Sequence, residues 1–248
     1  MSSRSSNDAT DGAFKIKESS FRQFISRQPG AEFPPEKGRY HLYISYACPW
    51  ASRCYAFMKL KGLEDDVIGL TVVKPVMERT KEGDDHYGWV FPETEDEVHG
   101  AQPDPLYGAR SIRELYDLAD PNYNGRYSVP AFMELFAALD RCEDILSKQR
   151  YIAGSELTEC DIRLFVTFIR FDQVYYGHFK CNKRLIQQYP NLLNYTKDIY
   201  QTDSIADTVN MFHIKQGYYR SQHALNPHGV VPIGLNIDFS TKHDRDRF

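Results

Sequence analysis

Residues 40–62 read YHLYISYACPWASRCYAFMKLKG, a strand-like run that is followed at once by a helix-like one. Residues 40–46 are rich in aromatic side chains, which favour a strand. Proline is favoured at the first position of a helix because its missing N–H needs no partner there, so Pro49 predicts a helix from residue 49 to about residue 61. Cys48 is therefore expected at the N-cap of this helix.

Cys48 is the candidate nucleophile of the chain. The unpaired N–H groups at a helix N-terminus and the positive end of the helix dipole favour an anion such as a thiolate. The alternative is a small buried cysteine at a strand–helix junction, which is a common place for this residue type. A dithiol protein would carry a second cysteine three residues later, but that position is Ala51, so the expected chemistry is monothiol.

Cys54 is expected in the core rather than in the site. It continues an apolar stripe with Trp50, Phe57 and Met58 on the predicted helix.

Composition excludes several classes of function. The formal charge of −4 and the pI near 6.1 leave no basic surplus for nucleic acid. No apolar run approaches the ~20 residues that cross a membrane. The five cysteines are an odd number without framework spacing, which indicates a reducing, cytoplasmic compartment. His178 and Cys181 form a ligand pair without a second pair, so no metal site is expected.

Periodicity divides the remaining chain into elements. Residues 1–19 are predicted to be a disordered tail. A second strand at 68–73 should pair in parallel with 40–46, because a crossover helix joins them. A long loop follows at 74–105, and then helices at 111–118, 132–146, 192–200 and 205–218. Thr158 and Asp161 have the spacing of a capping box before a helix that is apolar all round, so that helix should be buried.

Several local motifs carry a resemblance that runs from about residue 20 to the C-terminus. They surround Cys48, Trp89, Arg113, Val129–Pro130, Arg170, His178 and Thr208. Together they resemble the glutathionyl-hydroquinone reductases, the omega-like Xi class of glutathione transferases. The resemblance implies an α/β, thioredoxin-like N-terminal domain over residues 20–130, which is incomplete here, and an all-α C-terminal domain over residues 131–248.

The resemblance also implies a reaction and its residues. Cys48 would attack the sulfur of a glutathionyl-hydroquinone and expel the hydroquinone, and a second glutathione would resolve the mixed disulfide. Trp89, Arg113 and the backbone of Val129 would hold glutathione, with Pro130 in the cis form. Tyr218 would lie near the aromatic substrate, where its O–H could stabilise or protonate the leaving group. Glutathione is thus a co-substrate, no metal is implied, and a homodimer is expected.

Each of these side chains also has a plainer interpretation. Trp89 could be a packing aromatic, and Arg113 could be a solvated charge on a helix. Tyr218 lies in an aromatic-rich helix end, where packing is as good an interpretation as catalysis.

The resemblance is interrupted between Pro130 and Ala131. The family carries there a hairpin, a helix with a Glu-Ser pair that binds the γ-glutamyl group, and at least one further helix. The chain instead continues directly into a helix of the C-terminal domain, so an internal segment is expected to be missing. Ser52 is a smaller departure, because the family commonly has a histidine at this position.

Two other functions remain open at this level. The chain could be an inactive glutathione-transferase-like isoform that acts as a binding or interaction protein, which the missing segment favours. It could also be a general glutathione thiol transferase, which would act on small mixed disulfides.

Overall fold

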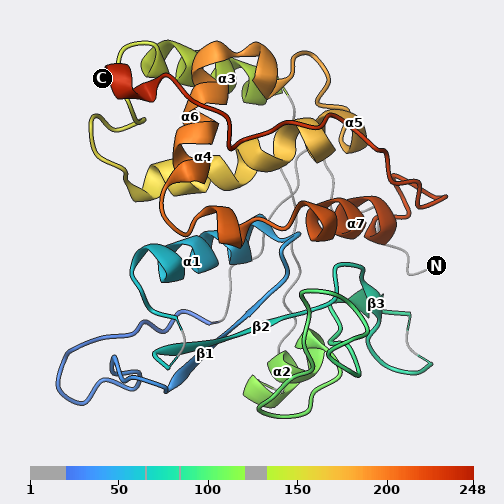
Figure 1. Ribbon diagram of the computed structural model, residues 1–248. Helices are drawn as coiled ribbons and strands as arrows, with labels where there is room; N and C mark the ends of the chain where they lie inside the picture. Colours follow the sequence, from blue (N-terminus) through green and yellow to red (C-terminus); the bar gives the residue numbers. More distant parts are fainter. Residues whose placement is uncertain (1–20, 65, 84, 121–132) are drawn as a thin grey trace.

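The computed structural model describes residues 21–64, 66–83, 85–120 and 133–248. A small sheet with helix α1 beside it and helix α2 (Ile112–Ala119) occupies the lower half of Figure 1, and a bundle of helices occupies the upper half. The bundle comprises α3 (Met133–Leu146), α4 (Glu159–Arg170), α5 (Tyr176–His178) and α6 (Pro190–Gln201). Helix α7 (Met211–Ser221) runs between the two halves. The predicted disordered tail, the proposed boundary after Pro130 and the Val129–Pro130 pair lie outside the described residues.

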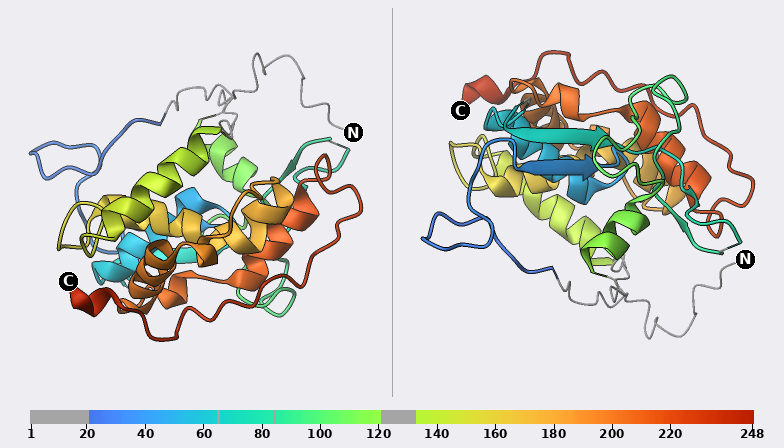
Figure 2. Two further views of the ribbon diagram at one scale, coloured as in Figure 1. Left: turned by 90° about the horizontal axis from the view of Figure 1, so that it is seen from above. Right: turned by 90° about the horizontal axis from the view of Figure 1, so that it is seen from below.

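The sheet confirms the predicted strand–helix–strand unit. Strands β1 (Tyr40–Ile44) and β2 (Ile68–Val72) pair in parallel, with Ile44 opposite Val72, and lie side by side in the right view of Figure 2. Both strands end earlier than predicted. After β1 the chain turns, and the Cys48 N–H donates to the Ser45 carbonyl at 3.0 Å. Within the described ranges this sheet contains these two strands only.

Helix α1 (Pro49–Leu60) begins as predicted, but only Phe57 and Met58 of its predicted apolar stripe pack in the core. Cys54 is exposed, and Trp50 is 55% exposed. Besides Met58, the buried face contains Ser52, Tyr55 and Ala56. The sequence pattern did not predict this face, because it contains the polar Ser52. Ser52 can be buried since its hydroxyl accepts a hydrogen bond from the buried Arg170.

The predicted long loop contains two very short antiparallel strands, β3 (Glu78–Arg79) and β4 (Tyr87–Gly88). Its later part is held by Asp104, whose carboxylate accepts hydrogen bonds from the Tyr43 hydroxyl and from the N–H groups of Leu106, Tyr107 and Ala109. Helix α2 then begins after Ser111, whose hydroxyl accepts from the Glu114 N–H. The loop is thus fixed against the sheet by its own polar groups.

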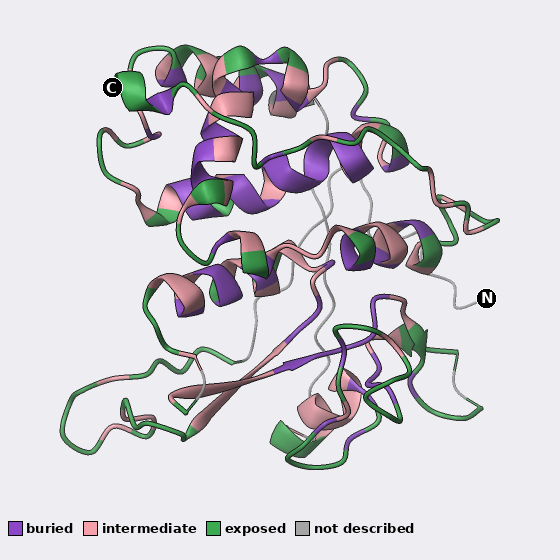
Figure 3. Cartoon of the chain, in the orientation of Figure 1, coloured by how far each residue is buried: buried purple, intermediate pink, exposed green. Residues whose placement is uncertain are grey.

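Helix α4 is the centre of the bundle, as its burial in Figure 3 shows. The predicted capping box is confirmed: Asp161 accepts from the N–H of Thr158 at 2.8 Å. The same carboxylate also accepts from the Tyr195 hydroxyl at 2.9 Å and from the Ile152 N–H. One buried acid therefore caps α4 and ties it to α6.

Two features follow α4 that periodicity did not predict. The chain makes a π-helical turn, η2 (Phe171–Tyr175), before α5. The helix predicted at 205–218 actually begins at Met211, because Asn210 is its N-cap and accepts from the His213 N–H. A short 3-10 turn, η4 (Ala206–Thr208), precedes it.

The segment after α7 returns across the bundle to the chain end (Figure 1). Its anchor is Arg245 in the last turn, η5 (Arg245–Arg247), which is fully buried. The Arg245 guanidinium donates to the carbonyls of Leu146 at 2.9 Å and Arg150 at 2.8 Å, and also to that of Gln149. A cation here satisfies the last carbonyl of α3 and two carbonyls of the turn that follows it. In the part of the chain described, none of the helices combines the length and apolarity needed to cross a bilayer.

Candidate active site

Cys48 lies at the N-cap of α1, as the sequence predicted, with Pro49 at the first helical position. Its backbone is extended, and its carbonyl accepts the first helical hydrogen bond from the Ser52 N–H at 3.0 Å. The side chain is partly buried and makes no capping hydrogen bond. The sulfur therefore sits at the positive end of α1 and remains accessible for chemistry.

Arg170 is the buried cation beside this thiol. It is 1% exposed and ends α4. Its guanidinium donates to the Tyr46 carbonyl at 2.7 Å and to the Ser52 hydroxyl at 2.7 Å. A third hydrogen bond goes back to the Val166 carbonyl at 2.5 Å, and the buried Nε has no partner among the described residues. Arg170 thus ties the bundle to the turn that carries Cys48.

No carboxylate of the described residues forms an ion pair with Arg170. Burial lowers the pKa of Arg170, whereas neighbouring Tyr175, Tyr218 and Cys48 raise it. An arginine nevertheless stays charged in proteins, and a buried charge is costly unless an opposite charge compensates it. Tyr175, Tyr218 and Cys48 are the titratable groups that act on this charge.

Two phenols complete the cluster. The hydroxyls of Tyr175, in η2, and Tyr218, in α7, are 3.2 Å apart, and their rings pack edge to face at 5.6 Å. Burial, followed by the charge of Tyr175, raises the pKa of Tyr218 well above the ordinary value. Burial also raises the pKa of Tyr175. Both groups therefore remain O–H donors at neutral pH, and Cys48 is close enough to contribute to both shifts.

Gly217 lets α7 approach this cluster closely. A Cβ at this position would lie 2.5 Å from the Ala47 Cβ and 2.8 Å from the Pro75 carbonyl oxygen, and the Trp89 Cη2 would be 3.7 Å away. A larger residue would push α7 away from the turn before Cys48, and Tyr218 would move with it. The same contact places Trp89 at the edge of the site.

Arg113 lies on α2, and its guanidinium donates to the Thr80 hydroxyl at 3.4 Å. The segment of Trp89 borders α2, because the Trp89 carbonyl accepts from the Ile112 N–H at 3.0 Å. The structure thus places Trp89 beside Gly217, which also faces Ala47 next to Cys48, and it places Arg113 on the neighbouring helix α2. Val129 and Pro130, and with them the predicted cis peptide, lie outside the described residues.

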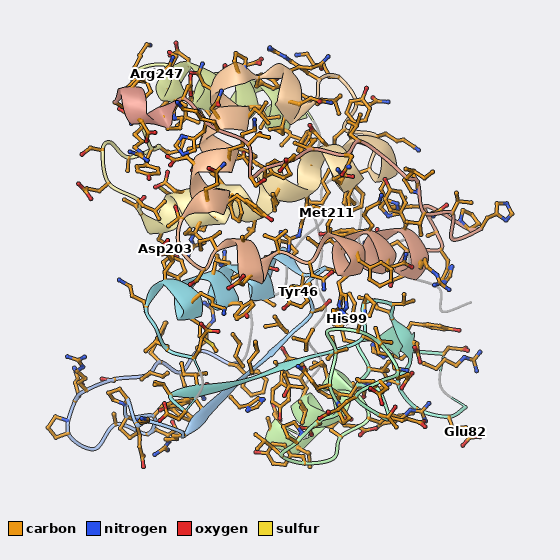
Figure 4. All side chains as sticks on the ribbon, viewed as in Figure 1. Tyr46, Glu82, His99, Asp203, Met211 and Arg247 are labelled. Carbon is orange, nitrogen blue, oxygen red and sulfur yellow. The ribbon has the colours of Figure 1, made fainter. Side chains whose placement is uncertain are left out.

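A second contact fixes α7 against the sheet half. His213 is fully buried, its Nε2 lies 2.7 Å from the His99 carbonyl, and its ring packs edge to face on Tyr46 at 5.4 Å. Tyr46, His99 and Met211 are labelled at this junction in Figure 4. The junction therefore packs α7, which carries Tyr218, against the segment that leads to Cys48.

Sequence reasoning assigned no roles to Arg170, Tyr175 and Gly217. Arg170 ends an otherwise apolar helical pattern, and Gly217 interrupts a helix where glycine is unfavourable, so both carried a local signal. The sequence gives no such signal for Tyr175, because a π-helical turn sets its direction and a search for a 3.6-residue period does not detect that turn.

The chain was compared with known proteins. It is 34% identical to glutathionyl-hydroquinone reductase YqjG from Escherichia coli K12, and the alignment covers 96% of this chain and 94% of that protein. The chain belongs to the glutathionyl-hydroquinone reductase family. These are enzymes, and glutathionyl-hydroquinone reductase PcpF from Sphingobium chlorophenolicum is 32% identical over 91% of each chain. A family model for the glutathione S-transferase C-terminal domain matches residues 99–198.

Solved structures of the family give the same result. A Xi-class transferase from Natrialba magadii superposes with a TM-score of 0.83 at 33% identity, covering 93% of this chain and 90% of that one. The glutathione-bound structure of YqjG gives a TM-score of 0.82 at 33% identity, covering 94% and 99%. The predicted thioredoxin-like domain followed by a helical transferase domain is thereby confirmed as the fold class of this chain.

The comparison with YqjG also supports the predicted internal gap. The aligned stretch has 318 positions, whereas this chain has 248 residues, so at least 70 of those positions have no counterpart here. The place of the gap after Pro130 remains a prediction. Among the described residues of this family member, no three potential ligand residues cluster around a metal-sized site.

Proposed function

We propose that this chain reduces glutathionyl-hydroquinones with Cys48 as the nucleophile and glutathione as co-substrate. The observation that carries the proposal is the buried Arg170, which has no carboxylate partner among the described residues and lies beside Cys48 and two protonated phenols. A positive site at a thiol, bordered by hydroxyl donors, suits attack on sulfur with an aromatic leaving group.

The proposed reaction has two steps. In the first, the Cys48 thiolate attacks the glutathionyl sulfur, a sulfur–sulfur bond forms, and the bond between that sulfur and the ring carbon breaks. The electron pair stays on the ring, which takes up a proton to give the hydroquinone. In the second, the thiolate of another glutathione attacks the Cys48 mixed disulfide and releases glutathione disulfide. The conjugate is thus reduced by two electrons, and two glutathionyl groups are oxidised to the disulfide.

The phenols and the glutathione-binding residues have separate proposed roles. The Tyr218 hydroxyl, paired with that of Tyr175, donates to an oxygen of the leaving hydroquinone or delivers its proton. Trp89 and Arg113 bind the glutathionyl part with the backbone of Val129 and with Pro130. A homodimer in the cytoplasm remains part of the proposal.

The test is release of hydroquinone from its glutathionyl conjugate in the presence of glutathione. The proposal requires turnover by the wild-type chain and a loss of kcat in Tyr218→Phe, whose ring still packs but no longer donates. Activity on a small aliphatic glutathione mixed disulfide, without activity on the conjugate, would instead identify a general thiol transferase.

A binding protein without turnover is a second candidate. The gap of at least 70 aligned positions relative to YqjG favours it, since the family's γ-glutamyl contacts are expected there. It would bind a glutathionyl conjugate in calorimetry and release no hydroquinone over many equivalents.

A further inference from the structure

Three rings from the segment after α4 surround the Tyr218 side chain. The rings of Tyr175, His178 and Phe179 pack edge to face against it, with ring centres at 5.6, 6.3 and 5.7 Å. Tyr175 also shares a hydrogen bond with the Tyr218 hydroxyl, whereas His178 meets Tyr218 through its ring. This short segment of the bundle therefore sets the place of the Tyr218 ring.

His178 also holds the end of α7 by a hydrogen bond. It is 5% exposed, and its Nε2 lies 3.0 Å from the Gln222 side-chain oxygen. An amide oxygen can only accept, so this contact requires the His178 proton on Nε2. Burial lowers the pKa of His178, which keeps the ring neutral at pH 7. The hydrogen bond thus joins the bundle to α7 about one helical turn after Tyr218.

Gln222 is a firm partner because its backbone is fixed as the C-cap of α7. Its carbonyl accepts from the N–H groups of Leu225 at 2.9 Å and Asn226 at 3.0 Å. The Asn226 side-chain amide in turn donates to the Tyr219 carbonyl at 2.7 Å, and the Tyr219 ring packs on His178 at 4.9 Å. Rotation of the last turn of α7 would therefore break several contacts at once.

The segment that carries His178 is itself fixed. Lys180 has φ near +60°, which is uncommon for a residue with a side chain and persists where neighbouring contacts impose it. After this turn the Cys181 N–H donates to the Tyr175 carbonyl at 3.1 Å, and the Phe179 N–H donates to the same carbonyl at 3.2 Å. Tyr175 and His178 are thus tied together by their own backbone.

We propose that His178 is a positioning residue for Tyr218, and that it fixes the direction of the Tyr218 hydroxyl through its ring contact and its hydrogen bond to Gln222. This role rests on the proposed reaction, in which that hydroxyl donates to the leaving hydroquinone. Proton transfer needs close alignment of donor and acceptor, so a hydroxyl that points elsewhere loses most of its effect on the rate. His178 acts only through Tyr218 in this proposal.

The first measurement is steady-state release of hydroquinone by variants of the full chain. His178→Phe keeps a ring and Gln222→Met keeps a long side chain, but each removes the hydrogen bond. Each should lower kcat about tenfold and change KM by less than about twofold. Gln222→Glu keeps an acceptor for His178 and should retain the wild-type kcat. His228→Phe, at an exposed histidine, is the matched control and should leave kcat unchanged.

Three further measurements separate positioning from a general effect on packing. In the Tyr218→Phe background, which lacks the hydroxyl, His178→Phe should cause no further loss of kcat. A conjugate whose ring carries electron-withdrawing groups should show a smaller loss in His178→Phe, because such a ring stabilises the developing charge itself. Alkylation of Cys48 at pH 7 should keep its wild-type rate in His178→Phe. Circular dichroism and thermal melting verify the fold of each variant.

The outcomes distinguish this role from the proposed function. Wild-type kcat in His178→Phe, or an equal further loss in the Tyr218→Phe background, would overturn the positioning role while the reaction stands. A loss in Gln222→Glu as large as that in Gln222→Met would assign the effect to packing and overturn it as well. Wild-type kcat in Tyr218→Phe would instead refute the part of the hydroxyl in the reaction, and the role of His178 with it.

Discussion

The two halves of the molecule differ in the size of their hydrophobic cores. The helical bundle has a continuous core that includes Ile162, Phe165, Leu192 and Tyr195, all almost fully buried. The sheet half has two two-stranded sheets among its described residues and two small cores, one with Ile44, Tyr55, Met58 and Val72 and the other with Val73, Phe91 and Ala109. A two-stranded sheet is marginal without cover, so the sheet half depends on the bundle.

The candidate site is formed by residues from both halves. The proposed nucleophile Cys48 belongs to the weaker half, whereas the cation Arg170 and the phenol of Tyr175 belong to the stronger one. The hydrogen bonds from Arg170 to Tyr46 and Ser52 cross the boundary. The bundle therefore positions the site and stabilises the segment that carries the thiol.

The largest expected effect is at Cys48. Cys48→Ser should lower hydroquinone release about a thousandfold or more, because an alcohol is a poor nucleophile toward sulfur. Cys54→Ser is the matched control on the same helix, since that side chain is exposed on another face. Steady-state rates with both variants give the answer, and full activity in Cys48→Ser would refute the assignment.

The second effect concerns the gap. A version that carries the family's segment after Pro130 should bind glutathione more tightly than the chain as it stands, by about a hundredfold or more. Two charge-assisted hydrogen bonds to the γ-glutamyl group would be restored, each with a contribution of roughly 1.5–3 kcal/mol. Calorimetry of both proteins measures the difference. Equal affinities with equally cooperative melting would mean that the segment is dispensable.

The third effect tests how much the buried Arg245 stabilises the helical bundle. Arg245→Met should lower the free energy of unfolding by about 2 kcal/mol, because the last carbonyl of α3 and two carbonyls of the turn after it lose a charged donor. Arg247→Met, at an exposed neighbour in the same turn, should change it by less than about 0.5 kcal/mol. Urea unfolding followed by circular dichroism compares them. Equal losses in the two variants would show that Arg245 is no anchor.

The smallest effect separates charge from hydrogen bonding at the boundary. Arg170→Met should slow alkylation of Cys48 at pH 7 on the order of tenfold, since the positive charge beside the sulfur is lost. Ser52→Ala removes one acceptor of Arg170 and keeps the charge, so its alkylation rate should stay near that of the wild type. A similar loss in both variants would assign the effect to local packing.

The sequence predicted the features that depend on neighbours along the chain. The N-cap position of Cys48, the capping box of Thr158 and Asp161, and the parallel pairing around α1 all follow from local geometry. It missed what depends on contacts across the fold. Ser52 is buried because Arg170, 118 positions away, donates to it, and this contact reversed the predicted burial of Cys54.

The same distinction applies to the site. Trp89 and Tyr218 were found through motifs, and the structure places both around Gly217, whose close approach no periodicity reveals. Tyr175 reached the cluster through a π-helical turn that shifts the register of the helix. The site residues that the sequence did not predict therefore lie outside the sheet half: Arg170 and Tyr175 lie in the bundle, and Gly217 lies in α7.

The most direct test of the central claim is to trap the first half of the reaction. The chain is mixed with a glutathionyl-hydroquinone in the absence of free glutathione, and the protein is digested and examined by mass spectrometry while released hydroquinone is measured. We predict one equivalent of hydroquinone per chain and one glutathionyl group in disulfide linkage on Cys48. Continued turnover without a Cys48 adduct, or a glutathionyl group on another cysteine, would contradict the account.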